Sequence, residues 1–158
     1  MTIAHLSLRW LSALCFGILT APAWAQLGDL AASHVAGTTT VRPPRHAIAN
    51  GAAMVRTATD DGGTTLDEYT DRTGRIFAYG WQGPTMPDLR VLLGSYLAAY
   101  RTGADTQAAA QPWTASLHAT RVDAGTVVVE AGGRMGAYVG RAWLPDALPS
   151  GVATANLR

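Results

Sequence analysis

Hydrophobic and polar residues alternate along three stretches in the middle of the chain, which is the pattern of strands that bury one face. These stretches are residues 52–59, 64–70 and 75–82. Turns rich in Gly and Asp separate them at residues 60–63 and 71–74. The pattern therefore predicts three consecutive antiparallel strands joined by short turns.

The third of these strands carries an aromatic row. Strict alternation predicts one face with Phe77, Tyr79 and Trp81 and an opposite face with Ile76, Ala78 and Gly80. Such a row is typical of core packing beneath a helix, because aromatic side chains bury large areas. A binding platform for sugars or peptides is the alternative.

A helical period replaces the alternation after residue 88. Apolar residues recur at spacings of three and four and form one stripe: Leu89, Leu92, Leu93, Tyr96, Leu97 and Tyr100. Thr85 and Asp88 resemble a capping box, and Gly103 suits the end of the helix. We therefore expect a helix from residue 89 to about Gly103, followed by a loop over residues 103–112.

Three further strands follow, over residues 113–122, 126–131 and 135–144. Turn residues separate them at 123–125 and 132–133. The order is three strands, one helix and three strands, which indicates the α+β class. We expect an antiparallel sheet of about six strands with the helix packed on one face.

The two strand triplets match without a gap at a shift of 62 residues (143 − 81). The matched pairs are Asp61/Asp123, Gly63/Gly125, Thr64/Thr126, Glu68/Glu130, Arg72/Arg134, Gly74/Gly136 and Trp81/Trp143. A duplication would place two similar meanders around a pseudo-twofold axis. Shared hairpin chemistry is the other explanation, since Gly and Asp belong in turns.

The N-terminus has the pattern of a secretory signal peptide over residues 1–25. Arg9 precedes an apolar run over residues 10–20, and Ala23-Trp24-Ala25 matches a cleavage site. The run is shorter than the roughly 20 residues that span a bilayer. We expect a mature chain that starts at Gln26, contains no cysteine and has no transmembrane segment; an uncleaved anchor is the alternative.

The mature chain divides into three parts. Residues 26–50 are expected to form a flexible N-terminal arm, because Pro43 and Pro44 do not suit a sheet interior; a tether or partner-binding strand is the alternative. Residues 51–152 form a single α+β domain, and residues 153–158 form a C-terminal tail.

Charge excludes two classes of partner. The chain has 12 basic residues, all of them arginine, and 11 acidic ones; loss of Arg9 leaves 11 (12 − 1) against 11. Nucleic acids and anionic membranes attract clustered excess cation, which this sequence does not have. We therefore expect no nucleic-acid partner.

Several segments resemble a known family. They are residues 79–90 (YGWQGPTMPDLR), 92–96, 128–133 and 140–145. They resemble the small secreted proteobacterial proteins grouped as domain-of-unknown-function family 2844, over residues 51–152. The resemblance implies export from a Gram-negative cell, and it implies no activity and no catalytic residue.

Catalytic and metal-binding patterns are weak. No His or Cys spacing is typical of a metal site, and no cofactor is expected. Ser116 and His118 share a strand face in the predicted sheet, which is most simply an ordinary solvated pair. Glu68 and Glu130 would form a carboxylate pair if the repeat were real.

The best candidate binding residues lie at the strand-to-helix corner. They are Trp81, Gln82, Thr85 and Met86, in a segment that two prolines stiffen. A purely structural corner is the alternative. The sequence thus predicts a non-catalytic interaction or assembly module for an unknown envelope protein or polymer. A small hydrolase that uses carboxylates and a secreted inhibitor that presents this loop are the alternatives.

Overall fold

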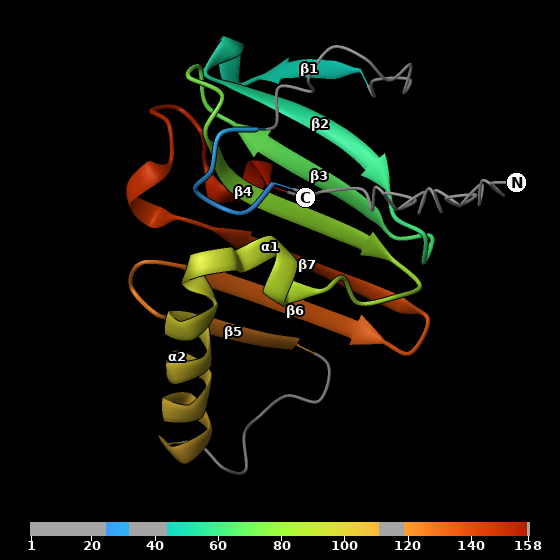
Figure 1. Ribbon diagram of the computed structural model, residues 1–158, viewed down its shortest axis with the longest axis vertical. Coiled ribbons are helices and arrows are strands. Elements are labelled where there is room, and N and C mark those ends of the chain that lie inside the picture. Colours follow the sequence, from blue (N-terminus) through green and yellow to red (C-terminus); the bar gives the residue numbers. More distant parts are fainter. Residues whose placement is uncertain (1–24, 32–43, 111–118, 158) are drawn as a thin grey trace, which may run out of the picture.

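A computed structural model of the chain describes residues 25–31, 44–110 and 119–157. These residues form a seven-stranded antiparallel sheet in the order β1-β2-β3-β4-β7-β6-β5, with helices beside it (Figure 1). The strands are β1 Arg45–Ile48, β2 Ala53–Thr59, β3 Thr65–Thr70, β4 Ile76–Gly83, β5 Ala119–Asp123, β6 Val128–Arg134 and β7 Ala137–Trp143. The helices are α1 Leu89–Leu93 and α2 Leu97–Ala110, with a 3-10 turn, Gly94–Tyr96, between them. The α+β class is confirmed, with one strand more than expected.

The additional strand comes from the segment expected to be a flexible arm. β1 pairs with β2 at the edge of the sheet, which is where a strand that follows two prolines is tolerated. Residues 25–31 are also built into the fold: Leu27 N–H donates to Leu92 O and Gly28 N–H donates to Ile76 O, both at 2.8 Å. The folded part therefore begins before residue 51, and residues 32–43 lie outside the described residues.

The sheet carries a core on each face. One contains Leu27, Leu66, Tyr79, Trp81, Leu92, Leu93, Val129 and Ala142, and it lies beneath α1 and residues 25–31. The other contains Val55, Tyr69, Phe77, Val128, Trp143, Val152 and Leu157. Figure 1 shows α1 in front of the sheet and the segment after β7 behind it. The segment expected as a tail thus contributes to the second core, because Leu157 is buried there.

A β-bulge corrects the expected face of Phe77. The β3–β4 register shifts between Tyr69 and Thr70, which pair with Ala78 and Ile76 and leave Phe77 as the extra residue. Ile76 therefore joins the core beneath α1 with Tyr79 and Trp81, whereas Phe77 joins the opposite core. Strict alternation was wrong here because one unpaired residue exchanges the faces of the positions before it.

The apolar stripe is confirmed, but the end of the helix is not. Leu92 and Leu93 are buried, and the other members of the stripe pack against the same core. The helix bends at Gly94 and continues as α2 through Gly103 to Ala110. The loop expected over residues 103–112 was therefore wrong for residues 103–110. A Cβ at Gly103 would stand 3.1 Å from Val122 Cγ1. Gly103 thus lets α2 approach β5 closely instead of ending the helix.

The helix cap also differs from the prediction. Asp88 is the N-cap of α1, and its carboxylate accepts from Arg90 N–H at 2.9 Å. Thr85 bonds to Thr64 instead. Pro87 therefore lies immediately before the N-cap of α1.

The last hairpin turns later than expected. Arg134 pairs with Ala137, so Met135 and Gly136 form a two-residue turn, with Gly136 at φ +79°. Gly132 and Gly133, expected to form the turn, lie inside β6. A Cβ at Gly133 would stand 2.1 Å from Ala137 O, which explains the glycine within the strand.

The topology pairs the two meanders, but their matched residues are not equivalent. β4 and β7 lie side by side in the sheet, with β3, β2 and β1 beyond β4 and with β6 and β5 beyond β7. Trp143 pairs with Ala78 and therefore lies on the same face of the sheet as Ala78. Trp81 is three positions further along β4, so it lies on the opposite face. The 62-residue match thus joins positions of opposite orientation. No helix among the described residues is long and apolar enough to span a membrane.

Candidate functional site

The structure separates Trp81 from the other predicted binding residues. Trp81 lies in the central strand β4 and is 1% exposed. Its ring covers Gly140, where a Cβ would stand 2.3 Å from Trp81 Cζ2. Trp81 is therefore a core residue and is not accessible to a partner, which corrects its assignment to a binding surface.

The remaining candidates, Gln82, Thr85 and Met86, are exposed at the corner between β4 and α1. The corner is held by the buried Thr64, whose hydroxyl donates to Thr85 O at 2.7 Å and accepts from Thr85 N–H at 3.1 Å. Met86 is 41% exposed, so this fixed loop presents an apolar side chain to solvent. Its role in binding stays a prediction.

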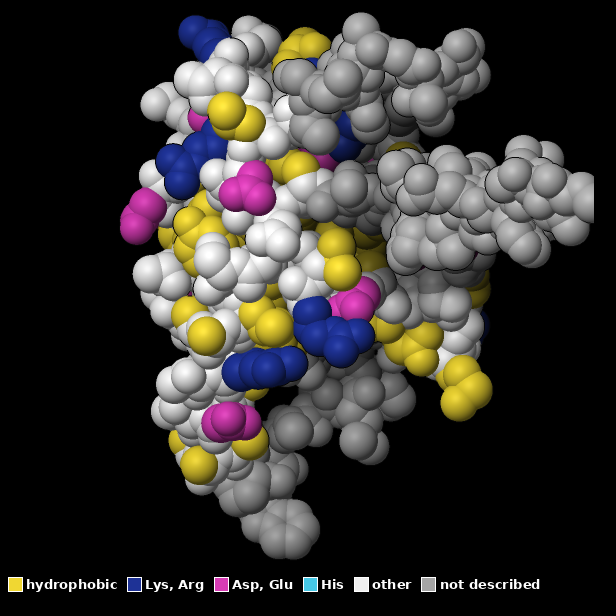
Figure 2. Space-filling view, viewed as in Figure 1, with side chains coloured by type: hydrophobic (Ala, Val, Ile, Leu, Met, Phe, Trp, Pro, Cys, Tyr) yellow, Lys and Arg dark blue, Asp and Glu magenta, His cyan; other side chains and the backbone are white. Residues whose placement is uncertain are grey.

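The face that carries this loop is mixed in character. On the described surface in Figure 2, hydrophobic side chains are interspersed with charged and polar ones. Met86 and Val91 are among the exposed large apolar residues of the described chain, at 41% and 40%. Single exposed apolar residues are normal on protein surfaces. The corner is thus a weak candidate for a binding surface.

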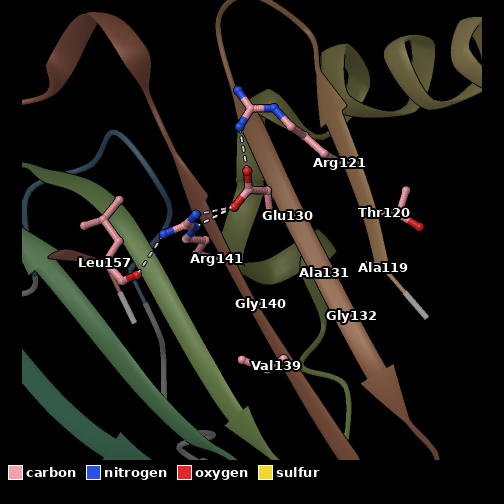
Figure 3. Close-up of a pocket in the computed structure, with 10 residues that line it drawn as sticks. All are labelled: Ala119, Thr120, Arg121, Glu130, Ala131, Gly132, Val139, Gly140, Arg141 and Leu157. Atoms are coloured by element: carbon pink, nitrogen blue, oxygen red, sulfur yellow. Dashed lines mark hydrogen bonds and ion pairs between the residues drawn. The ribbon is translucent and has the colours of Figure 1, made fainter. Parts of the chain in front are cut away.

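A groove on the face of the sheet opposite α1 lies over β5, β6 and β7 and has a volume of about 500 Å³ (Figure 3). At one end, Arg121, Glu130 and Arg141 stand directly opposite one another on the three strands. Along the rest, Ala119, Gly132 and Val139 form an equivalent row on the same face. The groove therefore combines a charged end with a floor of small and apolar residues.

Glu130 holds the charged end together. Arg121 Nη1 lies 2.5 Å from Glu130 Oε1, and Arg141 Nη2 lies 2.6 Å from Glu130 Oε2. Arg141 also donates from Nη1 to Thr154 O at 2.7 Å and to Leu157 O at 3.2 Å. Arg141 thus links the last strand to the C-terminal segment and forms one wall of the groove.

Both guanidinium groups also lie over Trp143. Arg121 Cζ is 5.4 Å and Arg141 Cζ is 5.5 Å from the centroid of its ring, which is the geometry of cation–π contacts. The buried indole and the shared carboxylate together restrict both arginines. Arg121 is exposed, and its Nη2 also lies 3.5 Å from Asp123 Oδ2. Its guanidinium group is therefore held at the end of the groove by Glu130, Asp123 and Trp143.

The protonation state of Glu130 follows from these contacts. Desolvation alone would raise the pKa of Glu130, but hydrogen bonds from Arg141 and Arg121 outweigh it, and the pKa lies below its ordinary value. Glu130 is therefore ionised at neutral pH and does not serve as a proton donor there.

Glu68, the other predicted carboxylate, lies elsewhere. It pairs with Tyr79 across β3 and β4, and Tyr79 in turn pairs with Ala142, so Glu68 lies on the α1 side. Glu130 pairs with Arg141, the neighbour of Ala142, and therefore lies on the other side. The two glutamates cannot act together, and the predicted carboxylate pair was wrong.

Sequence reasoning missed Arg121, Arg141 and the groove. Arg121 and Glu130 flank the turn after residue 123, and this spacing was the available signal of a cross-strand ion pair. The pairing of β6 with β7 then brings Arg141 to the same carboxylate. Ser116 and His118 lie outside the described residues, and no group of three metal-binding side chains occurs within them.

Comparisons with known proteins give a family without an assigned activity. No curated protein matches the chain, and no solved structure matches it. One family model matches residues 23–157, which is most of the chain and includes both the groove and the corner. The chain therefore belongs to the family described as protein of unknown function (DUF2844).

Proposed function

We propose that this protein is an exported, non-catalytic binding module of the Gram-negative envelope, and that the groove over β5, β6 and β7 is its contact surface. The observation that carries the proposal is the composition of the groove. Its floor is apolar and largely accessible, as the 49% exposure of Val139 illustrates, and constrained guanidinium groups close one end. Such a surface suits an extended segment with an apolar side chain beside a carbonyl or carboxylate.

Export is supported by the N-terminal pattern of Arg9, an apolar run and Ala23-Trp24-Ala25. The family match begins at residue 23, next to the expected cleavage site. N-terminal sequencing of the protein from the envelope fraction of its native cell tests this part of the proposal. A chain that starts at Gln26 supports it, and a cytoplasmic chain that keeps residues 1–25 contradicts it.

The electrostatics favour binding over the alternative of a carboxylate hydrolase. A general acid needs a raised pKa, whereas the pKa of Glu130 is lowered by two arginines. Glu68 is 1% exposed and is paired with Arg56 at 2.6 Å. These two glutamates therefore do not provide the acid and base of a hydrolase.

The contact surface is tested by photo-crosslinking in the envelope of the native cell. A photoreactive amino acid at Ala119, on the edge strand β5 and in the row that forms the groove floor, should crosslink to a partner. The substitution Val139→Asp should abolish that product, because it places a charge on the apolar floor. Val91→Asp is the matched control, since Val91 is similarly exposed on α1, away from the groove. Equal crosslinking in Val139→Asp and wild type would exclude the groove.

A further inference from the structure

A buried polar row crosses the sheet beneath the N-terminal segment. Arg56, Glu68 and Tyr79 stand opposite one another on β2, β3 and β4. Arg56 Nη2 lies 2.6 Å from Glu68 Oε2, and Tyr79 Oη lies 3.3 Å from the same oxygen. The Tyr79 hydroxyl also hydrogen-bonds to the carbonyl oxygen of Ala25. The row therefore ends at the residue that precedes the expected mature N-terminus.

Glu68 is incompletely satisfied in this arrangement. Its Oε1 is buried and has no hydrogen-bond partner among the described residues. A buried carboxylate oxygen without a donor is costly, because its lost hydration is not replaced. Arg56 donates to Glu68 through Nη2, and its Nε is also buried without a partner among the described residues. Glu68 Oε1 can therefore accept one more donor, and a cation suits a carboxylate best.

The segment that begins at Gln26 is held in place by its own contacts. Leu27 and Gly28 donate to Leu92 O and Ile76 O, and Asp29 O accepts from Ile76 N–H at 2.9 Å. The side chain of Gln26 lies against Gly94, where a Cβ would stand 2.2 Å from Gln26 Oε1. These contacts do not involve Ala25, so they position Gln26 whether or not Ala25 is present.

We propose that, in the processed chain, the α-ammonium group of Gln26 binds the Tyr79 hydroxyl and the Glu68 carboxylate and thereby completes the buried row. The proposal rests on the proposed export and cleavage. Hydrolysis adds one water across the Ala25–Gln26 bond, so that Ala25 leaves as a carboxylate and the nitrogen of Gln26 becomes an amine, which takes a proton. That nitrogen lies about 2.3 Å from the Ala25 oxygen in the intact peptide group, and therefore close to Tyr79.

The charges around the site favour an added cation. The groups that face it are Arg56, Glu68, Tyr79 and Asp29; the last acts on Tyr79 through its charge. Burial, followed by the charge of Glu68, raises the pKa of Tyr79, so the phenol stays neutral. One arginine faces two carboxylates, and the ammonium group of Gln26 balances them.

The pH dependence follows from the sign of this interaction. A free α-amine has a pKa of about 7.7–8.0. Pairing with Glu68 raises the pKa of the Gln26 amine in the folded chain. The resulting stability is therefore fully present below the unfolded pKa and is lost as the pH rises through the folded pKa.

The composition of the chain makes this amine directly measurable. The sequence has no lysine, so the α-amine of Gln26 is the one amine of the mature protein. The experiment uses full-length mature protein that starts at Gln26, and it follows acylation by an N-hydroxysuccinimide ester by intact mass as a function of pH. We expect acylation of the folded protein to be at least about tenfold slower near neutral pH than in urea, corresponding to a pKa rise of about one unit or more.

Variants separate the ion pair from simple burial. Tyr79→Phe keeps the ring and should speed acylation, and Glu68→Gln should lower the apparent pKa of the amine if that variant folds. Glu130→Gln, on the opposite face, is the control and should leave the rate unchanged. Acylation of folded wild type with the pKa of a free amine overturns the ion pair. Loss of one ammonia, as in a Gln26 that has cyclised, overturns it as well, because no amine then remains.

Failure of the cleavage site and failure of the ion pair give different results. If the envelope protein starts at another residue, N-terminal sequencing overturns the cleavage site and the processed ion pair together. If it starts at Gln26 and the amine behaves as a free one, the export proposal stands and only the ion pair fails.

Discussion

Trp81 lies on Gly140 of the neighbouring strand with no space between them for a side chain. A Cβ at Gly140 would stand 2.3 Å from Trp81 Cζ2 and 2.5 Å from Glu130 O. The contact joins β4 to β7, the central pair that connects the two meanders. The absence of a side chain at residue 140 is therefore a condition for packing the largest buried ring.

Gly140→Ala should consequently destabilise the protein. Overpacking of this kind costs about 1–3 kcal/mol, which lowers the melting temperature by several degrees in a domain of this size. Val139→Ala is the control, because Val139 is the preceding residue and faces the groove. Thermal unfolding followed by circular dichroism checks the prediction, and a Gly140→Ala variant as stable as Val139→Ala would contradict the tight contact.

Leu93→Asp should unfold the protein, whereas Arg90→Ala should have little effect. Leu93 lies on the buried face of α1 and is fully buried, and an unpaired carboxylate there costs several kcal/mol out of a total of about 5–15. Arg90 is exposed and pairs with Asp88 on the surface, where solvent screening makes such an interaction weak. Urea titration of the two variants measures the difference. Similar midpoints would show that α1 does not pack as described.

The ion pairs of Glu130 should make stability depend on pH at the acidic end. Its pKa is lowered in the folded state, so its contribution is present above the unfolded pKa of about 4.3 and is lost as the pH falls through the folded pKa. Wild type should therefore exceed Glu130→Gln in melting temperature near neutral pH, and the difference should shrink as the pH falls to about 3. A difference that is constant over this range would exclude the pairing as its source.

The corner between β4 and α1 should tolerate substitution on its surface but not beneath it. Gln82→Ala combined with Met86→Ser should barely change the melting temperature, because both side chains are exposed. Thr64→Val should lower it, since the buried hydroxyl makes two hydrogen bonds to Thr85 and each is worth about 0.5–1.5 kcal/mol. Recovery of a crosslinked partner from the double variant then tests the loop as a binding surface. Unchanged recovery in a stable double variant would remove the loop as a site.

Local patterns were sufficient for the elements that depend on neighbouring residues. Alternation predicted β2, β3 and β4 to within about two residues at each end, and the stripe of Leu92 and Leu93 predicted the buried face of α1. The order of these elements was also sufficient for the α+β class. Periodicity carries this information because a side chain's direction repeats every two residues in a strand and every 3.6 in a helix.

The candidate sites depended on contacts between distant residues and could not be read from these patterns. Arg121, Glu130 and Arg141 form one row because β5, β6 and β7 pair in a particular register, and Trp81 is inaccessible because β4 lies at the centre of the sheet. A shift of one residue would send each of these side chains to the opposite face.

The sequence by itself thus determined the class of the fold, most of its strands and the apolar face of its helix, since these follow from local periodicity. The tertiary structure alone decided which strands are central, which face Phe77 occupies, and which side chains meet at the groove and at Ala25. These features rest on strand register and on a single bulged residue, and both are set by packing between segments that are far apart in the chain.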